Sequence, residues 1–163
     1  METKATLIRT EADPLTYPLH IIVRYELEKA LFNGDTTVAE LPALWRQKYQ
    51  DYLGIVPAND TEGILQDIHW PGGDFGYFPT YLLGQIYAAQ FLHTMSQTLP
   101  VTELLASGDY SQLTAWRKQH IFRLGASLTP QELVKQVTGE PLNPQYWLDW
   151  MTRTYEFAYQ VTD

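Results

Sequence analysis

The feature that most constrains the fold is the long stretch from Pro79 to Thr98, which contains no Asp, Glu, Lys or Arg. Its apolar residues recur at helical spacing, with Leu82, Ile86 and Ala89 on one stripe and Leu83, Tyr87 and Phe91 on another, so this stretch predicts a helix. A helix without a charged face is usually buried on most sides, and we expect this burial here. Its small residues, Gly84 and Ala88, would let another helix cross closely.

Glycines, prolines and capping residues divide the rest of the chain into further helical segments. The first predicted helix follows Pro18 and ends at Gly34, where a glycine can adopt the left-handed conformation of a helix end. The second is expected to begin at Thr36 or Thr37 and to end at Gly54. Asp60 is expected to cap a short helix that carries Gln66. Later helices are expected to begin at Ser111, at Thr129-Pro130 and at Asn143-Pro144, and the first two of these to end at Gly125 and Gly139.

No alternating pattern of apolar and polar residues is long enough to indicate a β-sheet. A short extended piece around Thr6 to Ile8 is the one departure that we consider. The sequence therefore predicts an all-α fold, and its length fits a single helical domain over residues 1–163.

The composition narrows the classes of function. Hydrophobic residues make up 45% of the chain, and 11 tyrosines and five tryptophans predict a core of large aromatic side chains with polar tips. A net charge of −8 argues against a nucleic-acid partner, which needs a basic face. The absence of cysteine excludes disulfides and thiolate metal sites. The first residues lack the apolar core of a signal peptide, and no apolar run could span a bilayer, so we expect a cytoplasmic protein without membrane contact.

Polar and aromatic residues crowd together in the segment Gly63-Ile64-Leu65-Gln66-Asp67-Ile68-His69-Trp70, just before the glycine-rich break Pro71 to Tyr77. Histidine titrates near neutral pH, and glycines let a backbone approach a ligand closely. This combination indicates the rim of a buried polar site; the alternative is a capped helix end with a hydrogen-bonded histidine. Tyr77 and Tyr81 are one turn apart and could point at that site, or could be plain core aromatics. Backbone N–H groups at the start of the following helix would favour an anion.

A second candidate lies in Ile8-Arg9-Thr10-Glu11-Ala12-Asp13, before the first helix. The planar fork of Arg9 suits a carboxylate, and Asp13 could cap the helix and hold Arg9 in place. The alternative is a surface ion pair at a helix start. The chain has no His-Glu-x-x-His spacing and no Gly-x-Ser-x-Gly, so it contains neither a recognisable metal site nor a serine nucleophile motif.

These two segments resemble the Ile-Arg-x-x-Ala/Ser-Asp and Gly-x-x-Gln-Asp-x-His-Trp signatures of the thermostable carboxypeptidase family of zinc metallocarboxypeptidases. The segments Phe75 to Tyr81, Leu83-Gly84 and Thr138 to Leu142 are also similar to that family. The resemblance extends from about Ile8 to the end of the chain. Members of the family are about three times as long, and they are mostly helical with a deep groove. Their zinc ligands lie in a His-Glu-x-x-His helix and a downstream glutamate motif, which this chain lacks. The resemblance therefore implies the C-terminal third of such an enzyme, without zinc bound by its own residues.

The resemblance also implies roles for individual residues. Arg9 would bind the free carboxylate at the C-terminus of a peptide substrate. His69 and Tyr81, or Tyr77, would be catalytic residues that stabilise the oxyanion formed when zinc-bound water attacks the last peptide bond. The remaining substrate-binding residues would be Asp13, Gln66, Asp67 and Trp70, of which the last three orient His69 and wall the groove.

Three hypotheses follow from these residues. In the first, the chain is the substrate-binding portion of a carboxypeptidase and is inactive alone. In the second, it is a non-catalytic protein that binds peptides or carboxylates. In the third, it needs a missing N-terminal metal-binding portion, or associates with itself, because an interface of a longer protein would otherwise be exposed.

Overall fold

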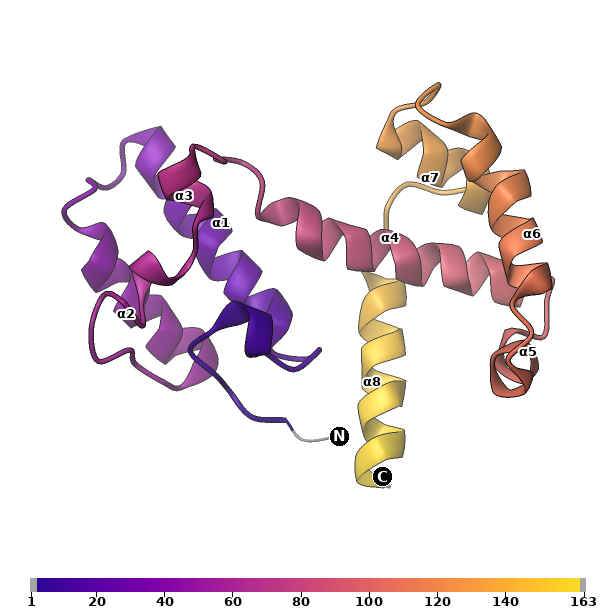
Figure 1. The fold of residues 1–163 in the computed structure, drawn as a ribbon, viewed down its shortest axis with the longest axis horizontal. Helices are drawn as coiled ribbons and strands as arrows, with labels where there is room; N and C mark the ends of the chain where they lie inside the picture. Colours follow the sequence, from indigo (N-terminus) through magenta and orange to yellow (C-terminus); the bar gives the residue numbers. More distant parts are fainter. Residues whose placement is uncertain (1–2, 162–163) are drawn as a thin grey trace. The chain divides into compact units, whose positions relative to one another are not determined.

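The computed structural model of the protein describes residues 3–161 and is helical, with no β-strand in that range, so the predicted all-α fold is confirmed (Figure 1). The α-helices, in chain order, are α1 (Tyr17–Asn33), α2 (Leu41–Leu53), α3 (His69–Gly72), α4 (Pro79–Ser96), α5 (Val101–Ser107), α6 (Ser111–His120), α7 (Pro130–Thr138) and α8 (Gln145–Tyr159). The described residues also form three short 3-10 helices: η1 (Arg9–Glu11) precedes α1, η2 (Ile64–Gln66) lies between α2 and α3, and η3 (Phe122–Leu124) lies between α6 and α7. None of the described helices is long and apolar enough to cross a bilayer.

The chain forms two compact units, of which the first ends at Leu82 and the second begins at Leu83. Helix α4 contributes residues to both units. Each unit has its own cluster of buried apolar side chains. Whether the units behave as the predicted single domain stays a prediction.

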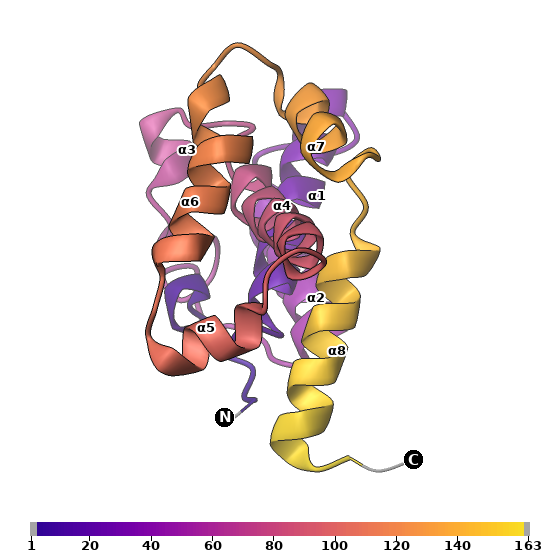
Figure 2. The same cartoon turned by 90° about the vertical axis from the view of Figure 1, so that its right-hand side faces the viewer.

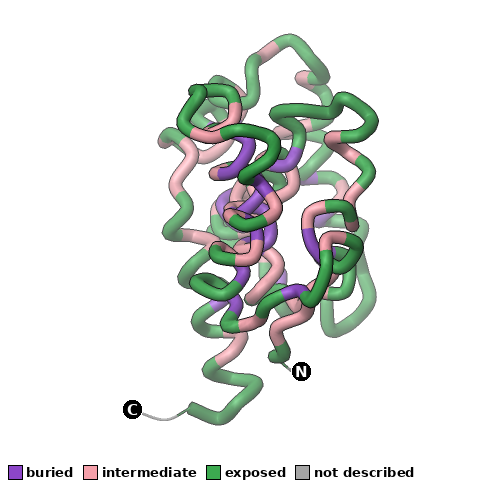
Figure 3. Tube along the Cα trace, turned by 90° about the vertical axis from the view of Figure 1, so that its left-hand side faces the viewer, coloured by how far each residue is buried: buried purple, intermediate pink, exposed green. Residues whose placement is uncertain are grey.

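The first unit is built on the packing of α1 against α2. Its core contains Val23 and Leu27 of α1 together with Trp45, Tyr49 and two leucines of α2. Figure 3 shows this unit with its buried positions enclosed by exposed turns. Both helices end at a glycine with positive φ, namely Gly34 at 78° and Gly54 at 71°. A residue with a Cβ atom is strained there, so both predicted ends are confirmed for a local reason.

The second unit is built around α4 from Leu83 onwards (Figure 2). Its core joins Met95 of α4 to residues of α5 and α6, among them Leu104 and Trp116. The predicted start of α7 is confirmed, because Thr129 and Glu132 form a capping box in which each side chain accepts the backbone N–H of the other. The last helix was expected to begin at Asn143-Pro144, and α8 begins directly after Pro144.

Several local predictions were wrong. Helix α2 begins at Leu41, and the residue before it is Glu40 rather than a threonine. The carboxylate of Glu40 accepts the backbone N–H of Thr37 at 2.8 Å. The side chain of Asp60 does not cap η2 and instead pairs with Arg46. The short extended piece expected around Thr6 to Ile8 is not among these errors, because these residues lie outside any helix and Ile8 has extended backbone. The segment from Ser111 to Leu124 is two elements, since α6 ends at His120 and η3 follows. Helix α5 and the single turn of α3 were not predicted.

The expected burial of α4 on most sides was also wrong. Only Ala89, Gln90 and Met95 of this helix are buried, and both Gly84 and Ala88 are exposed. The residues of α4 are divided between two units, and the core clusters take up only Leu92 and Met95 of this helix. The apolar composition of this helix therefore indicated a long helix correctly but did not indicate full burial.

Candidate functional site

Arg9 and Asp67 form the ion pair at the centre of the candidate site. Arg9 begins η1, and Asp67 directly follows η2. Nη2 of Arg9 donates to Oδ1 of Asp67 at 2.9 Å, and Nε donates to Oδ2 at 3.4 Å. Nη1 of Arg9 donates to the hydroxyl of Tyr17 at 3.2 Å. The two sequence motifs thus meet through a charged pair in which Arg9 is only 6% exposed.

Arg24 of α1 is the site residue that the sequence analysis missed. Its Nε donates to Oδ2 of Asp67 at 2.7 Å, and its Nη1 donates to the backbone carbonyl of His20 at 2.9 Å. The guanidinium carbon lies 4.6 Å from the centroid of the Trp45 ring, and the side chain is completely buried. Its position could have revealed it, because Arg24 lies on the same face of the predicted helix as Leu27. A charged side chain that is buried on such an apolar face needs a partner of opposite charge.

Gln66 ties the two arginines to the same backbone segment. Its Oε1 accepts from the backbone N–H of Arg9 at 3.4 Å and from Nη2 of Arg24 at 3.3 Å. Its Nε2 donates to the carbonyl of Glu62 at 2.8 Å. The amide orientation is therefore fixed at both ends, and Gln66 holds the arginines without adding charge.

His69 extends the cluster towards α4. Its Nε2 lies 3.1 Å from the hydroxyl of Tyr81, a hydrogen bond that joins α3 to the first turns of α4. Its Nδ1 lies 3.6 Å from Oδ1 of Asp67, which is too long for a hydrogen bond, and this buried nitrogen has no other partner among the described residues. The guanidinium carbon of Arg9 lies 5.0 Å from the centroid of the Tyr81 ring, so Arg9, His69 and Tyr81 share one surface.

The other predicted site residues lie around this cluster in different environments. Tyr77 stacks on His69 with ring centroids 5.8 Å apart and is 49% exposed. Trp70 packs into the core, edge-on to Trp45 at 6.2 Å, so it supports the site from behind. Asp13 accepts the backbone N–H groups of the two residues just before α1, at 2.9 and 3.1 Å, while the carboxylate that binds Arg9 is that of Asp67.

The expected anion at the glycine-rich break is supplied by the protein itself. The carboxylate of Glu28 on α1 accepts the backbone N–H of Gly76, three residues before α4 begins. Gly76 has φ of 77°, a conformation that favours glycine. This contact fixes the break against α1, and it places Tyr77 and Tyr81 beside His69.

Electrostatics hold the central charges in place. Burial alone would raise the pKa of Asp67, but the hydrogen bonds and charges of Arg9 and Arg24 outweigh it and lower that pKa. Burial would lower the pKa of Arg9, but Asp67 and Tyr17 raise it. Burial, together with the charges of Arg24 and Arg9, lowers the pKa of His20 to about 4. Within the described residues, two guanidinium groups therefore pair with the carboxylate of Asp67, and this group of three side chains carries one positive charge in excess.

Arg9, which carries part of this positive charge, also has N–H donors that its contacts leave unused. An arginine side chain carries five N–H donors, and Arg9 uses three in the contacts to Asp67 and Tyr17. One N–H on each terminal nitrogen is left within the described part of the protein. Both donors belong to a guanidinium, the group that commonly binds a carboxylate through two hydrogen bonds.

Comparison with known proteins identifies the family. The family described as "Carboxypeptidase Taq (M32) metallopeptidase" matches residues 1–155. This chain belongs to that family. It is 50% identical over 159 residues to "Carboxypeptidase 1" of Bacillus subtilis (strain 168), a match that covers 97% of this chain and 32% of that protein.

Solved structures agree with this assignment to the carboxypeptidase Taq family. The M32 carboxypeptidase from Deinococcus radiodurans R1 matches with a TM-score of 0.94 and 35% identity, over 98% of this chain and 32% of that one. Metallocarboxypeptidase 1 of Trypanosoma cruzi matches with a TM-score of 0.92 and 42% identity, over 95% and 33% of the two chains. The chain thus spans about a third of the length of the relatives it matches. The predicted family, and the expectation that the chain matches only part of the length of its members, are confirmed.

A metal belongs to the chemistry of a metallopeptidase family, so we tested whether this chain could hold one. Among residues 3–161, no group of three or more His, Asp or Glu side chains is arranged to bind a metal ion. His69 and Asp67 are adjacent, but Asp67 is already bound by two arginines. The described side chains therefore do not fit a metal site.

Proposed function

We propose that this chain is the substrate-binding portion of a zinc metallocarboxypeptidase and that Arg9 binds the C-terminal carboxylate of the peptide. The observation that carries this proposal is the state of Arg9. Its guanidinium is oriented by Asp67 and Tyr17 and retains two N–H donors in a cluster with one excess positive charge. A carboxylate would balance that charge and use both donors.

His69 and Tyr81 stand beside this carboxylate site. Their hydrogen-bonded pair can donate to an oxygen that becomes negative during cleavage of the last peptide bond, with Tyr77 next to them. Gln66 and Asp67 fix the arginines and thereby the distance from the carboxylate site to His69. Trp70 supports α3 from the core, and Asp13 shapes the turn between Arg9 and α1.

The catalytic metal would be bound outside the residues described here. In the complete enzyme, zinc would supply the activated water that attacks the peptide bond. The chain alone is therefore expected not to release C-terminal residues, and its own residues bind, orient and donate. The comparisons do not favour the alternative of a non-catalytic peptide-binding protein, because the similar proteins are carboxypeptidases.

Exposed apolar residues beside the site support a proposal about partners. Leu65 is 66% exposed and Ile68 is 82% exposed, and both belong to the segment that carries Gln66 and Asp67. Apolar surface of this kind marks interaction sites. We infer that this surface contacts either a second copy of the chain or the metal-binding portion of the longer enzyme.

Calorimetry with short peptides tests the proposed function. An N-acetylated dipeptide with a free carboxylate should bind the chain, and the same dipeptide with a C-terminal amide should bind at least about tenfold more weakly. Arg9→Lys keeps the charge but loses the planar fork, so it should weaken binding of the free acid and leave the amide unaffected. Arg46→Gln removes an arginine of the same unit that pairs with Asp60 at the surface, and it is the matched control. Equal affinity for acid and amide would refute the proposal.

A further inference from the structure

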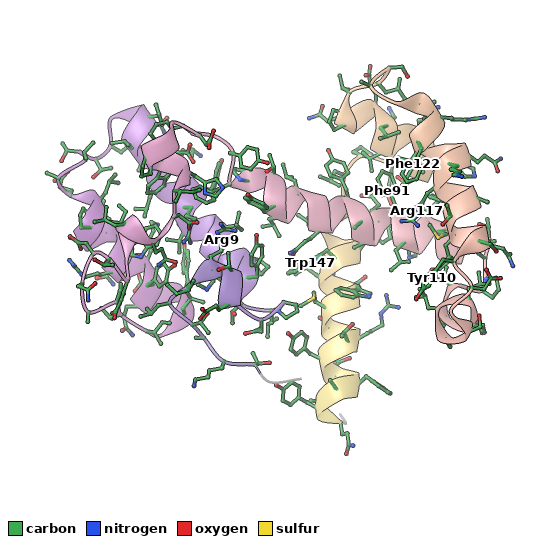
Figure 4. The ribbon with its side chains drawn as sticks, viewed as in Figure 1. Arg9, Phe91, Tyr110, Arg117, Phe122 and Trp147 are labelled. Carbon is green, nitrogen blue, oxygen red and sulfur yellow. The ribbon has the colours of Figure 1, made fainter. Side chains whose placement is uncertain are left out.

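An apolar pocket of about 520 Å³ opens in the second unit where α4 meets α5 and α6 (Figure 4). Its walls are mostly aliphatic and aromatic, with Phe91, Leu92 and Met95 from α4, Leu105 from α5, Leu113 from α6 and Ile121 beyond it. Its volume falls in the range of about 300–1,000 Å³ that is typical of small-molecule sites. We call it the α4–α6 pocket. None of its residues belongs to the site around Arg9.

Arg117 supplies the one charge among the residues that line the α4–α6 pocket. Its Nη2 donates to the hydroxyl of Thr114 at 3.4 Å, and its guanidinium carbon lies 5.9 Å from the centroid of the Phe122 ring. Neither contact neutralises its charge, and no carboxylate pairs with Arg117 within the described residues. The pocket therefore combines an apolar interior with an uncompensated cation.

The surrounding sequence reinforces this positive charge. From Ser111 to Gln131 the chain carries Arg117, Lys118 and Arg123 and no Asp or Glu, although its net charge is −8. Tyr110, which also lines the pocket, is 56% exposed and adds a hydroxyl that can donate a hydrogen bond. An occupant that complements both features has an apolar body and an anionic end.

We propose that the α4–α6 pocket binds an amphipathic carboxylate of the fatty-acid class. Its aliphatic chain would lie against Phe91 and Leu105, and its carboxylate would bind Arg117. An aliphatic chain fits better than a highly charged ligand, because most of the pocket offers no hydrogen-bond partner. Each methylene group that becomes buried should tighten binding by about fourfold until the pocket is full.

Titration with decanoate below its micelle concentration, followed by calorimetry, tests this proposal on the whole chain. Decanoate should bind saturably with one molecule per chain and more tightly than octanoate. Decanol, which has the same tail without the charge, should bind about tenfold more weakly. Arg117→Gln should lower the affinity for decanoate to that for decanol. Arg123→Gln removes a neighbouring charge that does not line the pocket, and it should change affinity less than twofold.

Three results would overturn the proposal. The first is the absence of saturable binding, and the second is equal affinity for decanol and decanoate. The third is an unchanged affinity in Arg117→Gln. Sedimentation velocity with the Leu105→Glu variant tests whether a second copy of the chain covers the pocket instead. If decanoate does not bind and this variant abolishes a dimer of the wild-type chain, the pocket is instead covered by a second copy. Circular dichroism of Arg117→Gln and Leu105→Glu should match the wild type, since both residues are exposed.

Discussion

Arg24 and Asp67 form a buried ion pair that joins the middle of α1 to the end of η2, with Nε of Arg24 2.7 Å from Oδ2 of Asp67. Arg24 is fully buried, so its charge depends on this carboxylate. The same carboxylate holds Arg9. The orientation of the proposed substrate-binding arginine is therefore coupled to the stability of the first unit.

Asp67→Asn should destabilise the first unit strongly. Among residues 3–161, Asp67 supplies the one carboxylate that pairs with Arg9 and Arg24, and a buried pair that loses one partner typically costs roughly 3–5 kcal/mol. Urea denaturation followed by tryptophan fluorescence measures this change. Asp60→Asn breaks the exposed pair with Arg46 and should cost less than about 1 kcal/mol. Similar losses in the two variants would contradict the central role of Asp67.

Stability should fall as the pH is lowered from about 6.5 to about 4. His20 has a pKa lowered to about 4 by burial and by the charges of Arg24 and Arg9, against an ordinary histidine value of 6.5. Between these values the unfolded chain binds a proton that the folded chain does not, so stability rises with pH, by about 3 kcal/mol over this range. The pH dependence of the free energy of unfolding should flatten in His20→Gln. The exposed His93→Gln should keep the wild-type slope, and a flat wild-type profile would exclude this mechanism.

Gln90→Leu should loosen the segment between α7 and α8. The buried Nε2 of Gln90 donates to Thr138 and to the carbonyl of Pro141, each at 3.0 Å, and its Oε1 accepts the N–H of Asn143 at 2.9 Å. A leucine of similar size would leave the two backbone groups without partners, at a cost of about 2–3 kcal/mol. Hydrogen exchange at Asn143 should accelerate, whereas Gln97→Leu, at an exposed position just after α4, should leave it unchanged. Unaltered protection at Asn143 would show that the segment is held by other contacts.

Self-association should depend on Ile68. The purified chain is expected to form reversible oligomers at micromolar concentration, because Leu65 and Ile68 expose apolar surface beside the site. Ile68→Asp should shift the equilibrium towards monomer in sedimentation velocity experiments. Gln112→Asp, at an exposed polar position of α6 in the other unit, is the control and should have little effect. A wild-type chain that stays monomeric over a wide concentration range would rule out a second copy as the partner.

Part of the candidate site could be predicted because its residues occur in two short motifs. Arg9, Gln66, Asp67 and His69 were all named from the sequence, and the structure brings them together. Their partners could not be predicted in the same way. Asp13 is near Arg9 in sequence and was expected to hold it, yet Asp67, far along the chain, does so because η2 folds back against α1. The partner of Arg24 was hidden for the same reason, since its place on the Leu27 face indicates that it needs a partner but not which carboxylate on another element supplies it.

The sequence by itself determined the helical class and several helix ends, because these depend on neighbouring residues. Gly34 and Gly54 relieve backbone strain locally, and Thr129 finds its partner Glu132 within one turn. Only the tertiary structure decided which charges meet, how much of α4 is buried and that Arg117 lines an apolar pocket. Those features depend on contacts between segments far apart in the chain, and burial and ion pairing become defined only after the helices pack.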